Sequence, residues 1–363
     1  MKLIMQIKLK FDTEQKKFLL GTIKEANAAC NELSEFAFEN KIFNQFKLHK
    51  AKYHSVKSSF NLSAQMVVRC ISKVSDSYKK DKKKQRQFKE FGAITYDERI
   101  LSYNIGKRIA SIWSIDGRLK IPFIPYPEKY LSFMKGEADL IYKKGKFFLF
   151  QTCEVPEEEI KDVEEFLGVD FGINNIATLS NGKNYSSKKL NNYRERRQKI
   201  RSSIQSKGTR GSKKLLKRLR GRESRTASII NHTISKDIVA IAKTENKGIA
   251  LENLKGIRKS TFKRNKTFRT KLGKWSFYQL KQYLLYKAKL NGIPIIEIPP
   301  AYTSKMCNVC KHLGNRNNQK FKCDFCGNST DADFNASLNI RNWGDVVNSP
   351  EKQSILYCNL HFV

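Results

Sequence analysis

Four of the eight cysteines stand in two pairs with the spacing of a metal site. Cys307 and Cys310 form one C-x2-C pair, and Cys323 and Cys326 form another after twelve intervening residues. Two such turns facing each other create the tetrahedral four-sulfur site that zinc favours. Disulfides are disfavoured in a reducing cytosol, and a redox-active pair leaves the other pair unexplained. We therefore predict a structural zinc site, because four thiolates leave no open coordination position.

Acidic residues occur at three points of the chain where carboxylates are unusual. Asp170 ends an apolar run, and Glu252 interrupts an apolar strand pattern. A buried carboxylate is costly unless it is paired or bound to a metal, so a buried salt bridge is the alternative at Glu252. Asp331 and Asp333 open the pattern DADFNASLNI, where Asp331 could cap a helix and Asp333 would lie in its first turn.

Carboxylates from separated strands and a helix could together hold two Mg²⁺ ions. Magnesium prefers sites made of oxygen ligands. A pair of such ions activates a water molecule and stabilises the leaving oxygen in phosphodiester hydrolysis. None of the acidic patterns is specific alone, so the prediction depends on Asp170, Glu252 and Asp333 meeting in space.

The elements that must position these residues fall into two differently patterned halves. An opening strand over 2–10 precedes helical periodicity over 18–38 and 62–78, and short strands begin near residue 92. The second half follows an acidic stretch, and its predicted elements are strands from 166, over 248–254 and over 293–299, and helices over 224–244, 276–292 and 331–342. A length of 363 residues also suggests two or three domains.

The charge balance points to a polyanionic partner. Seventy Lys and Arg stand against 34 Asp and Glu, which gives a net charge of +36. Such an excess repels the compact chain from itself and is typical of proteins that bind nucleic acid. The most basic segments are 188–225, with 16 Lys or Arg against two Glu, and 255–275, with nine Lys or Arg and no acid. No run of 18 apolar residues exists and the N-terminus has no signal-peptide pattern, so we expect no membrane partner and a cytoplasmic, nucleoid-associated protein.

Taken together, the motifs resemble the nuclease half of the insertion-sequence TnpB (OrfB) family, which is related to the type V CRISPR effector nucleases. They are, in chain order, GVDFGINNIATLSNG, IALENLKGIR, YLLYKAKLNGIPIIEIPPAYTSKMCNVC, FKCDFCG and DADFNASLNI. The resemblance is specific over about residues 166–343 and much weaker before residue 150. Lys311 departs from the family pattern because it stands where a Gly is usual, and the tail beyond Gly344 matches nothing in it.

The resemblance implies an α/β architecture. An RNase H-like (RuvC) nuclease domain with an inserted zinc ribbon would follow an N-terminal β-barrel (wedge) domain that carries a helical recognition insertion. The implied boundaries are 1–155 for the wedge with its insertion at about 12–90, 156–300 for the first nuclease part, 301–330 for the ribbon, 331–344 for the last nuclease helix and 345–363 for a tail. Asp170, Glu252 and Asp333 would be the catalytic carboxylates, and the four cysteines would be the zinc ligands.

The implied function is that of an RNA-guided DNA endonuclease of a transposable element. Its partners would be a guide RNA and a double-stranded DNA target, with one protein per RNA and Mg²⁺ as the catalytic metal. The basic segments would hold the RNA–DNA duplex through its backbone. The candidate backbone contacts are Arg194, Arg197, Arg201, Lys213, Lys217, Arg220, Arg258, Lys263 and Arg264. The candidate contacts to a short DNA motif beside the target are Tyr53, Lys57 and Gln65.

Other functions remain open at this point. An RNA-guided DNA-binding repressor without cleavage would have lost the carboxylates, which are all present here. A transposase would join DNA ends without any RNA. A plain zinc-ribbon protein that binds RNA leaves the buried Glu252 and the DxD motif unexplained.

Overall fold

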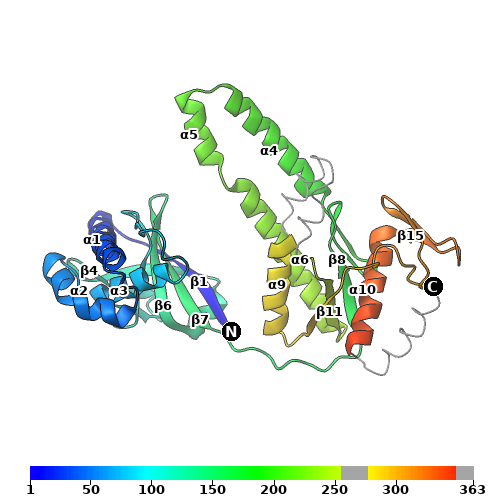
Figure 1. Cartoon of the computed structure of the whole chain (residues 1–363), viewed down its shortest axis with the longest axis horizontal. Coiled ribbons are helices and arrows are strands. Elements are labelled where there is room, and N and C mark those ends of the chain that lie inside the picture. Colours follow the sequence, from blue (N-terminus) through cyan, green and yellow to red (C-terminus); the bar gives the residue numbers. More distant parts are fainter. Residues whose placement is uncertain (255–276, 349–363) are drawn as a thin grey trace. The chain divides into compact units, whose positions relative to one another are not determined.

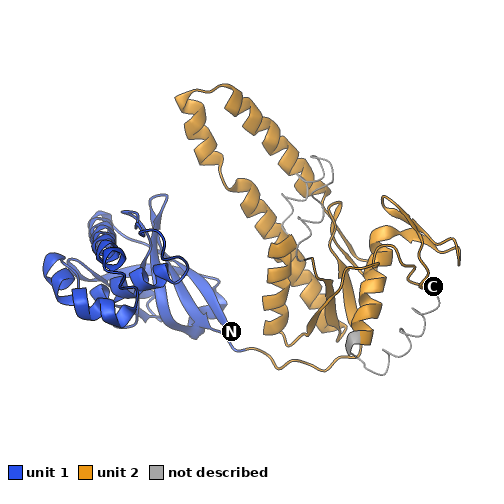
Figure 2. Cartoon of the chain, in the orientation of Figure 1, with its two compact units in different colours: residues 1–156 blue, residues 157–363 orange. Residues whose placement is uncertain are grey.

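The computed structural model describes residues 1–254 and 277–348 of the chain. It divides into two compact units, Met1–Pro156 and Glu157–Val363, which Figure 2 shows in different colours. The predicted contacts Arg258, Lys263 and Arg264 lie outside the described residues.

The first unit is built on a seven-stranded, near-barrel antiparallel sheet. Its strands follow the order β2-β6-β7-β1-β5-β4-β3, so the first strand of the chain lies in the middle of the sheet. Alternate residues of β1 are buried, and this period of two is the reason that the segment forms a strand with one face in the core. The bounds are β1 Lys2–Leu9, β2 Ile94–Tyr96, β3 Leu101–Asn104, β4 Ile109–Ser114, β5 Gly117–Tyr126, β6 Met134–Lys143 and β7 Lys146–Glu154.

Three helices are inserted between β1 and β2. They are α1 Thr13–Glu39, α2 Gln45–Ser59 and α3 Ala64–Tyr78. Each begins at a polar capping residue whose side chain accepts backbone N–H bonds: Asp12, Asn44 and Ser63. The basic α2 buries two residues, Leu48 and Val56, so most of its surface faces solvent.

A five-stranded mixed sheet forms the centre of the second unit, in the order β10-β9-β8-β11-β12. Strand β9 pairs antiparallel with β8 and with β10. Strand β11 lies between β8 and β12 and pairs parallel with both. The bounds are β8 Phe166–Asp170, β9 Asn175–Leu179, β10 Asn184–Ser186, β11 Gly248–Glu252 and β12 Ile295–Ile298. All five residues of β8 are buried, as expected for a central strand that is covered on both faces.

Helices cover both faces of this sheet (Figure 1). On one face, α6 (Arg222–Thr244) and α9 (Phe277–Leu290) bury apolar side chains against the strands. Two further helices, α4 (Lys188–Ser206) and α5 (Arg210–Leu219), form a hairpin that extends away from the sheet, as Figure 1 shows. We call this hairpin the basic arm, and it corresponds to the most basic predicted segment, for which the sequence indicated no helix.

The other face carries α10 (Ala332–Asn348), which crosses β8 at unusually short range. A Cβ added to Gly168 would lie 2.0 Å from the Ser337 carbonyl oxygen and 2.6 Å from the Arg341 backbone nitrogen. At Gly344, in turn, a Cβ would lie 2.9 Å from the Ala250 Cβ. Glycines on both sides of the contact therefore set the distance between α10 and the sheet.

Gly168→Ala is expected to push α10 away from β8 and to destabilise the second unit by about 1–3 kcal/mol, as overpacked cores do. Thermal or urea unfolding measures the loss. The matched control is Gly211→Ala in α5, where the nearest atom to an added Cβ is the Thr209 hydroxyl oxygen at 3.9 Å. That control should be neutral or slightly stabilising, and equal stability of both variants would contradict the packing argument.

A small three-stranded ribbon connects β12 to α10. It consists of β13 Asn315–Asn317, β14 Lys320–Lys322 and β15 Ser329–Asp331, all antiparallel. Its core is Cys307, Phe321, Cys323 and Ala332. Because Ala332 already belongs to α10, the ribbon and the helix share one core.

Candidate active site and metal centre

Parallel pairing of β8 and β11 brings two predicted carboxylates to one edge of the sheet. Val169 pairs with Leu251, so the next residues, Asp170 and Glu252, end neighbouring strands side by side. Carboxyl ends of parallel strands are where open α/β sheets place their ligands. The polar side chains thus begin where the two strands leave the apolar core.

Helix α10 brings the third carboxylate to the same edge. One side-chain oxygen of Asp331 accepts the backbone N–H groups of Asp333 and Phe334, each at 3.0 Å. Asp331 therefore caps the helix, as the sequence suggested, and Asp333 lies in the first turn. Asp333 is 5% exposed and lines a cavity that Asp331 does not line.

This cavity has a volume of about 430 Å³ and contains all three predicted catalytic residues. It is lined by Asp170, Phe171, Gly172, Ile173, Asn174, Glu252, Leu254, Pro300, Thr303, Ser304, Arg316, Asn318, Gln319 and Asp333. Its walls come from β8, β11, the ribbon and α10, which are far apart in the sequence. The tertiary structure therefore collects the carboxylates at one open pocket.

Neutral and cationic partners hold two of the three carboxylates. The Asn175 amide donates to one oxygen of Asp333 at 3.0 Å, and the Arg316 guanidinium donates to the other at 2.8 Å. The Thr303 hydroxyl donates to Glu252. These contacts fix the rotamers of Asp333 and Glu252 at the cavity wall.

The electrostatics of the cavity disfavour three ionised carboxylates in the absence of a metal cation. Burial raises the pKa of Asp170 well above its usual value, and the charges of Glu252 and Asp333 raise it further. Burial also raises the pKa of Glu252, although the Thr303 hydroxyl and the Arg316 charge oppose that shift. A divalent cation would remove this penalty, so the donor set fits a hard metal ion.

Among the described residues, the four cysteines form the one group of His, Cys, Asp or Glu side chains found to bring one ligand atom each close enough together to hold an ion. The three carboxylates line one cavity without forming such a group.

Arg316 is a cavity residue that the sequence analysis missed. It lies on β13 of the ribbon and forms the ion pair with the buried Asp333. A single Arg in the polar stretch between the two cysteine pairs carries no recognisable signal in the sequence, because its partner is contributed by another element.

Arg316→Gln should destabilise the Mg²⁺-free protein by about 1–3 kcal/mol, because the buried Asp333 loses its cationic partner. Urea unfolding without added Mg²⁺ measures the change and leaves the tetrathiolate site loaded. Adding Mg²⁺ should restore part of the lost stability, since the cation replaces the missing positive charge. Lys320→Gln, on the neighbouring strand with an exposed side chain, is the control and should behave as the unaltered chain. Equal stability of both variants without Mg²⁺ would exclude Arg316 as the counterion.

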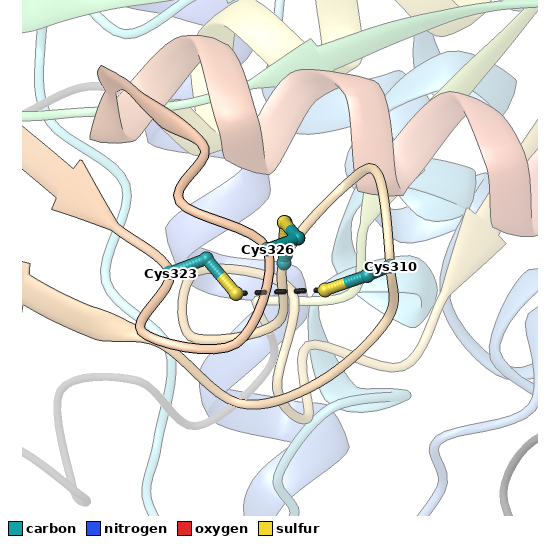
Figure 3. A group of neighbouring side chains, drawn as sticks. Cys310, Cys323 and Cys326 are labelled. Carbon is teal, nitrogen blue, oxygen red and sulfur yellow. Dashed lines mark hydrogen bonds between the residues drawn. The ribbon is translucent and has the colours of Figure 1, made fainter.

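The four cysteines form the predicted tetrathiolate cluster. The Sγ atoms of Cys307 and Cys326 are 3.7 Å apart. Those of Cys310 and Cys323, which are joined by the dashed line in Figure 3, are 3.5 Å apart. A disulfide requires about 2.05 Å, whereas sulfurs around a tetrahedral zinc lie about 3.8 Å apart. The distances therefore exclude disulfides and fit a metal. Burial raises the pKa of Cys307, but N–H bonds from Cys310, Asn328 and Val309 outweigh it and lower the pKa to about 6, whereas burial and the neighbouring thiols raise the pKa of Cys310 to about 12.

Buried asparagines attach the first cysteine turn to α10. The Asn335 amide donates to the Met306 carbonyl at 2.7 Å and accepts the Asn308 N–H at 3.0 Å. The Asn339 amide donates to the carbonyls of Met306 and Thr303. Lys311 has φ of 64°, the left-handed conformation that Gly adopts most easily, so the turn keeps its form despite the lysine.

The predicted backbone contacts in the described region lie on the basic arm. Arg197 and Arg201 are on α4, Lys213 and Lys217 are on α5, and Arg220 ends α5. Four of these five are exposed, and Arg197 is half-buried. Arg194 differs from the expectation, because it is 8% exposed and pairs with Glu223 at 3.3 Å. Its burial makes it a structural residue at the base of the arm.

The predicted DNA-motif contacts in the first unit are not equivalent. Tyr53 stacks on His49 at 4.6 Å between ring centroids, and the exposed Lys57 donates to the Leu62 carbonyl. Gln65 donates to Asp97 and accepts from Arg99 at 3.1 Å. Gln65 is thus already engaged within the unit, and it lies on α3 whereas the other two lie on α2.

No described helix combines the length and the apolar character that crossing a membrane would require.

Comparison with known proteins agrees with this organisation. Residues 150–258 match the family model described as a probable transposase (OrfB_IS605), and residues 277–340 match the Cas12f1-like TNB domain. A TnpB-like protein of Methanocaldococcus jannaschii is 33% identical over 43% of this chain and 56% of its own length. The CRISPR-associated endodeoxyribonuclease Cas12f1 of Sulfoacidibacillus thermotolerans is 32% identical over 54% of this chain and 50% of its own.

More distant matches point in the same direction. The putative RNA-guided DNA endonuclease InsQ of Escherichia coli is 26% identical over 56% of this chain and 55% of its own length. The chain thus spans about half the length of the curated relatives it matches. A cryo-EM structure of a Cas12f1–sgRNA–target DNA complex superposes with a TM-score of 0.66 at 17% identity, over 92% of this chain and 83% of that one, which shows a shared fold. Both family models and these relatives agree, so residues 150–258 are similar to OrfB_IS605 proteins, residues 277–340 are similar to the Cas12f1-like TNB domain, and the chain resembles TnpB-like and Cas12f proteins.

Proposed function

We propose that the protein is an RNA-guided DNA endonuclease that hydrolyses phosphodiester bonds with Mg²⁺. The observation that carries the proposal is the cavity at the carboxyl end of β8 and β11, where Asp170, Glu252 and Asp333 gather. Three antiparallel strands followed by two parallel ones, in the order β10-β9-β8-β11-β12, support an RNase H-like (RuvC) nuclease domain. The names of two similar proteins, the CRISPR-associated endodeoxyribonuclease Cas12f1 and the putative RNA-guided DNA endonuclease InsQ, support the same activity.

Asp170, Glu252 and Asp333 would hold the two ions, which activate a water molecule and stabilise the leaving oxygen. Thr303 and Asn175 orient the carboxylates through the hydrogen bonds described above. Arg316 neutralises Asp333 in the metal-free protein and offers a positive charge to a phosphate in the cavity. The tetrathiolate cluster would hold a structural zinc ion and thereby position Arg316.

A guide RNA and a double-stranded DNA target are the partners that this activity needs, with one protein per RNA. The exposed cations of the basic arm would contact the duplex backbone. Tyr53 and Lys57 on α2 would contact DNA beside the target. Gln65 would act there only after releasing Asp97 and Arg99.

The test is to express the protein from its native locus and to sequence the RNA that copurifies with it. The complex should then cut DNA that matches the guide segment in the presence of Mg²⁺, and not in EDTA. Cutting of unrelated DNA at the same rate would contradict guidance by RNA. Joining of DNA ends without RNA would instead favour a transposase, the function named in one family description.

A further inference from the structure

The outward face of α6 carries a stripe of four solvent-exposed residues. Ile234 and Ile238 fill the core on the inner side of this helix. On the opposite side, Arg225, Ile229, His232 and Lys236 follow one another at helical spacing, and all four are exposed. Ile229 is 66% exposed, which is unusual for so large an apolar side chain.

A tyrosine from α9 turns this stripe into a rigid aromatic surface. The rings of His232 and Tyr283 stack with centroids 3.8 Å apart at 19°. The Tyr283 hydroxyl bonds to the Ser228 hydroxyl at 2.9 Å, and Lys287 donates to the His232 carbonyl at 2.6 Å. The stack is therefore held by contacts at both helices before any ligand arrives.

The charge pattern of the stripe suits a polyanion with flat apolar groups. Arg225 and Lys236 lie eleven residues apart, or about 16 Å along the helix axis, with Ile229 and His232 between them. The nearest acid in the sequence, Asp237, is engaged by Tyr185 and Lys183. Partial burial and the Lys287 charge lower the pKa of His232, so its ring is uncharged at neutral pH.

We propose that this α6–α9 surface binds an unpaired nucleic-acid strand, with a nucleobase stacked on His232 over Tyr283 and phosphates beside Arg225 and Lys236. Unpaired strands bind to aromatic platforms flanked by cations, because every base offers a flat face for stacking. A protein partner fits less well, because an exposed imidazole between two cations offers little apolar area and the whole chain carries +36 charges. The proposal shares with the proposed function the premise that the chain binds nucleic acid, but it does not depend on cleavage.

The test uses the full chain with Asp170→Asn without added Mg²⁺, so that binding is measured without cutting. The probes are single-stranded DNA and RNA of one 20-nucleotide sequence, and the corresponding blunt duplex, each over a series of salt concentrations. His232→Ala should weaken binding of the single strands about 5-fold or more at each salt concentration, since base stacking contributes about 1–3 kcal/mol. The slope of the logarithm of the binding constant against the logarithm of the salt concentration should stay unchanged, because His232 carries no charge.

Lys236→Ala should instead reduce that slope by about 0.7, the loss of one phosphate contact on a single strand. Thr233→Ala is the matched control on the same helix, exposed but off the stripe, and should change neither quantity. Tyr283→Phe keeps the ring and removes the bond to Ser228, so it should bind nearly as well as the parent chain.

Photocrosslinking locates the contact directly. An RNA probe with 4-thiouridine or a DNA probe with 5-bromodeoxyuridine should crosslink to the peptide that contains Ile229 and His232. Comparing the RNA probe with the DNA probe shows which type of strand is preferred. Unchanged affinity of His232→Ala together with no crosslink on α6 would overturn the proposal. This binding test measures no cleavage, so its outcome is independent of the nuclease activity. If the parent protein binds single strands at this surface but does not cut guide-matched DNA, the proposed nuclease function is refuted and this inference stands.

Discussion

Asp170→Asn should abolish Mg²⁺-dependent cleavage and, at the same time, raise the melting temperature of the Mg²⁺-free protein. The carboxylate ends a strand whose residues are all buried, beside Glu252 and Asp333. Its negative charge therefore costs folding free energy unless a cation is present. An amide of the same shape removes that cost together with one metal ligand.

The pH dependence of stability follows from the raised pKa values of Asp170 and Glu252. Each group has a higher pKa in the folded chain than in the unfolded chain, so the folded state binds more protons between the two values. Stability without Mg²⁺ is therefore greatest below the unfolded pKa and falls as pH rises through the folded pKa. Mg²⁺ should oppose this fall in the parent chain and have less effect in Asp170→Asn.

Thermal unfolding without and with Mg²⁺, over a pH series, measures both effects. The expected gain for Asp170→Asn without Mg²⁺ at pH 7 is at least about 2 °C, the shift that roughly 1 kcal/mol produces in a domain of this size. Asp162→Asn, an exposed acid before β8, is the matched control and should change neither stability nor cleavage. Cutting by Asp170→Asn at the parent rate would exclude the proposed catalytic site.

Cys323→Ser should remove the bound metal and unfold the ribbon. Structural zinc sites contribute about 10–16 kcal/mol of apparent binding free energy, most of which is folding free energy of the small module around them. Phe321 and Ala332 share the ribbon core with the cysteines, so loss of the metal also loosens the start of α10. Because Asp333 lies in that first turn and Arg316 lies on the ribbon, cleavage should fall as well.

Elemental analysis should find about one zinc per chain in the parent protein and much less in Cys323→Ser. Backbone hydrogen exchange should then accelerate over 305–331 and leave β1, in the other unit, protected. Cys153→Ala, a buried cysteine outside the cluster, is the control and should retain its zinc. A metal-free variant with unchanged exchange in the ribbon would show that the cluster is dispensable for folding.

Local patterns predicted those parts of the fold whose cause is local. Asp331, for example, predicted the start of α10. The two cysteine pairs predicted the tetrathiolate cluster, because each pair needs only one tight turn. Helix α2 and the helices of the basic arm were not predicted, since their polar sequences bury few residues and show little apolar periodicity.

The sequence by itself determined the chemistry available to this protein: three carboxylates at element ends, four paired thiols and a large excess of positive charge. The tertiary structure decided which of these groups meet. Parallel pairing aligned Asp170 with Glu252, and the close approach at Gly168 brought Asp333 to them. The tertiary structure also pairs Arg316 with Asp333 and buries Arg194 against Glu223 at the base of the arm. Such choices depend on strand register and on distances between packed elements, and both arise from contacts between residues that are far apart in the chain.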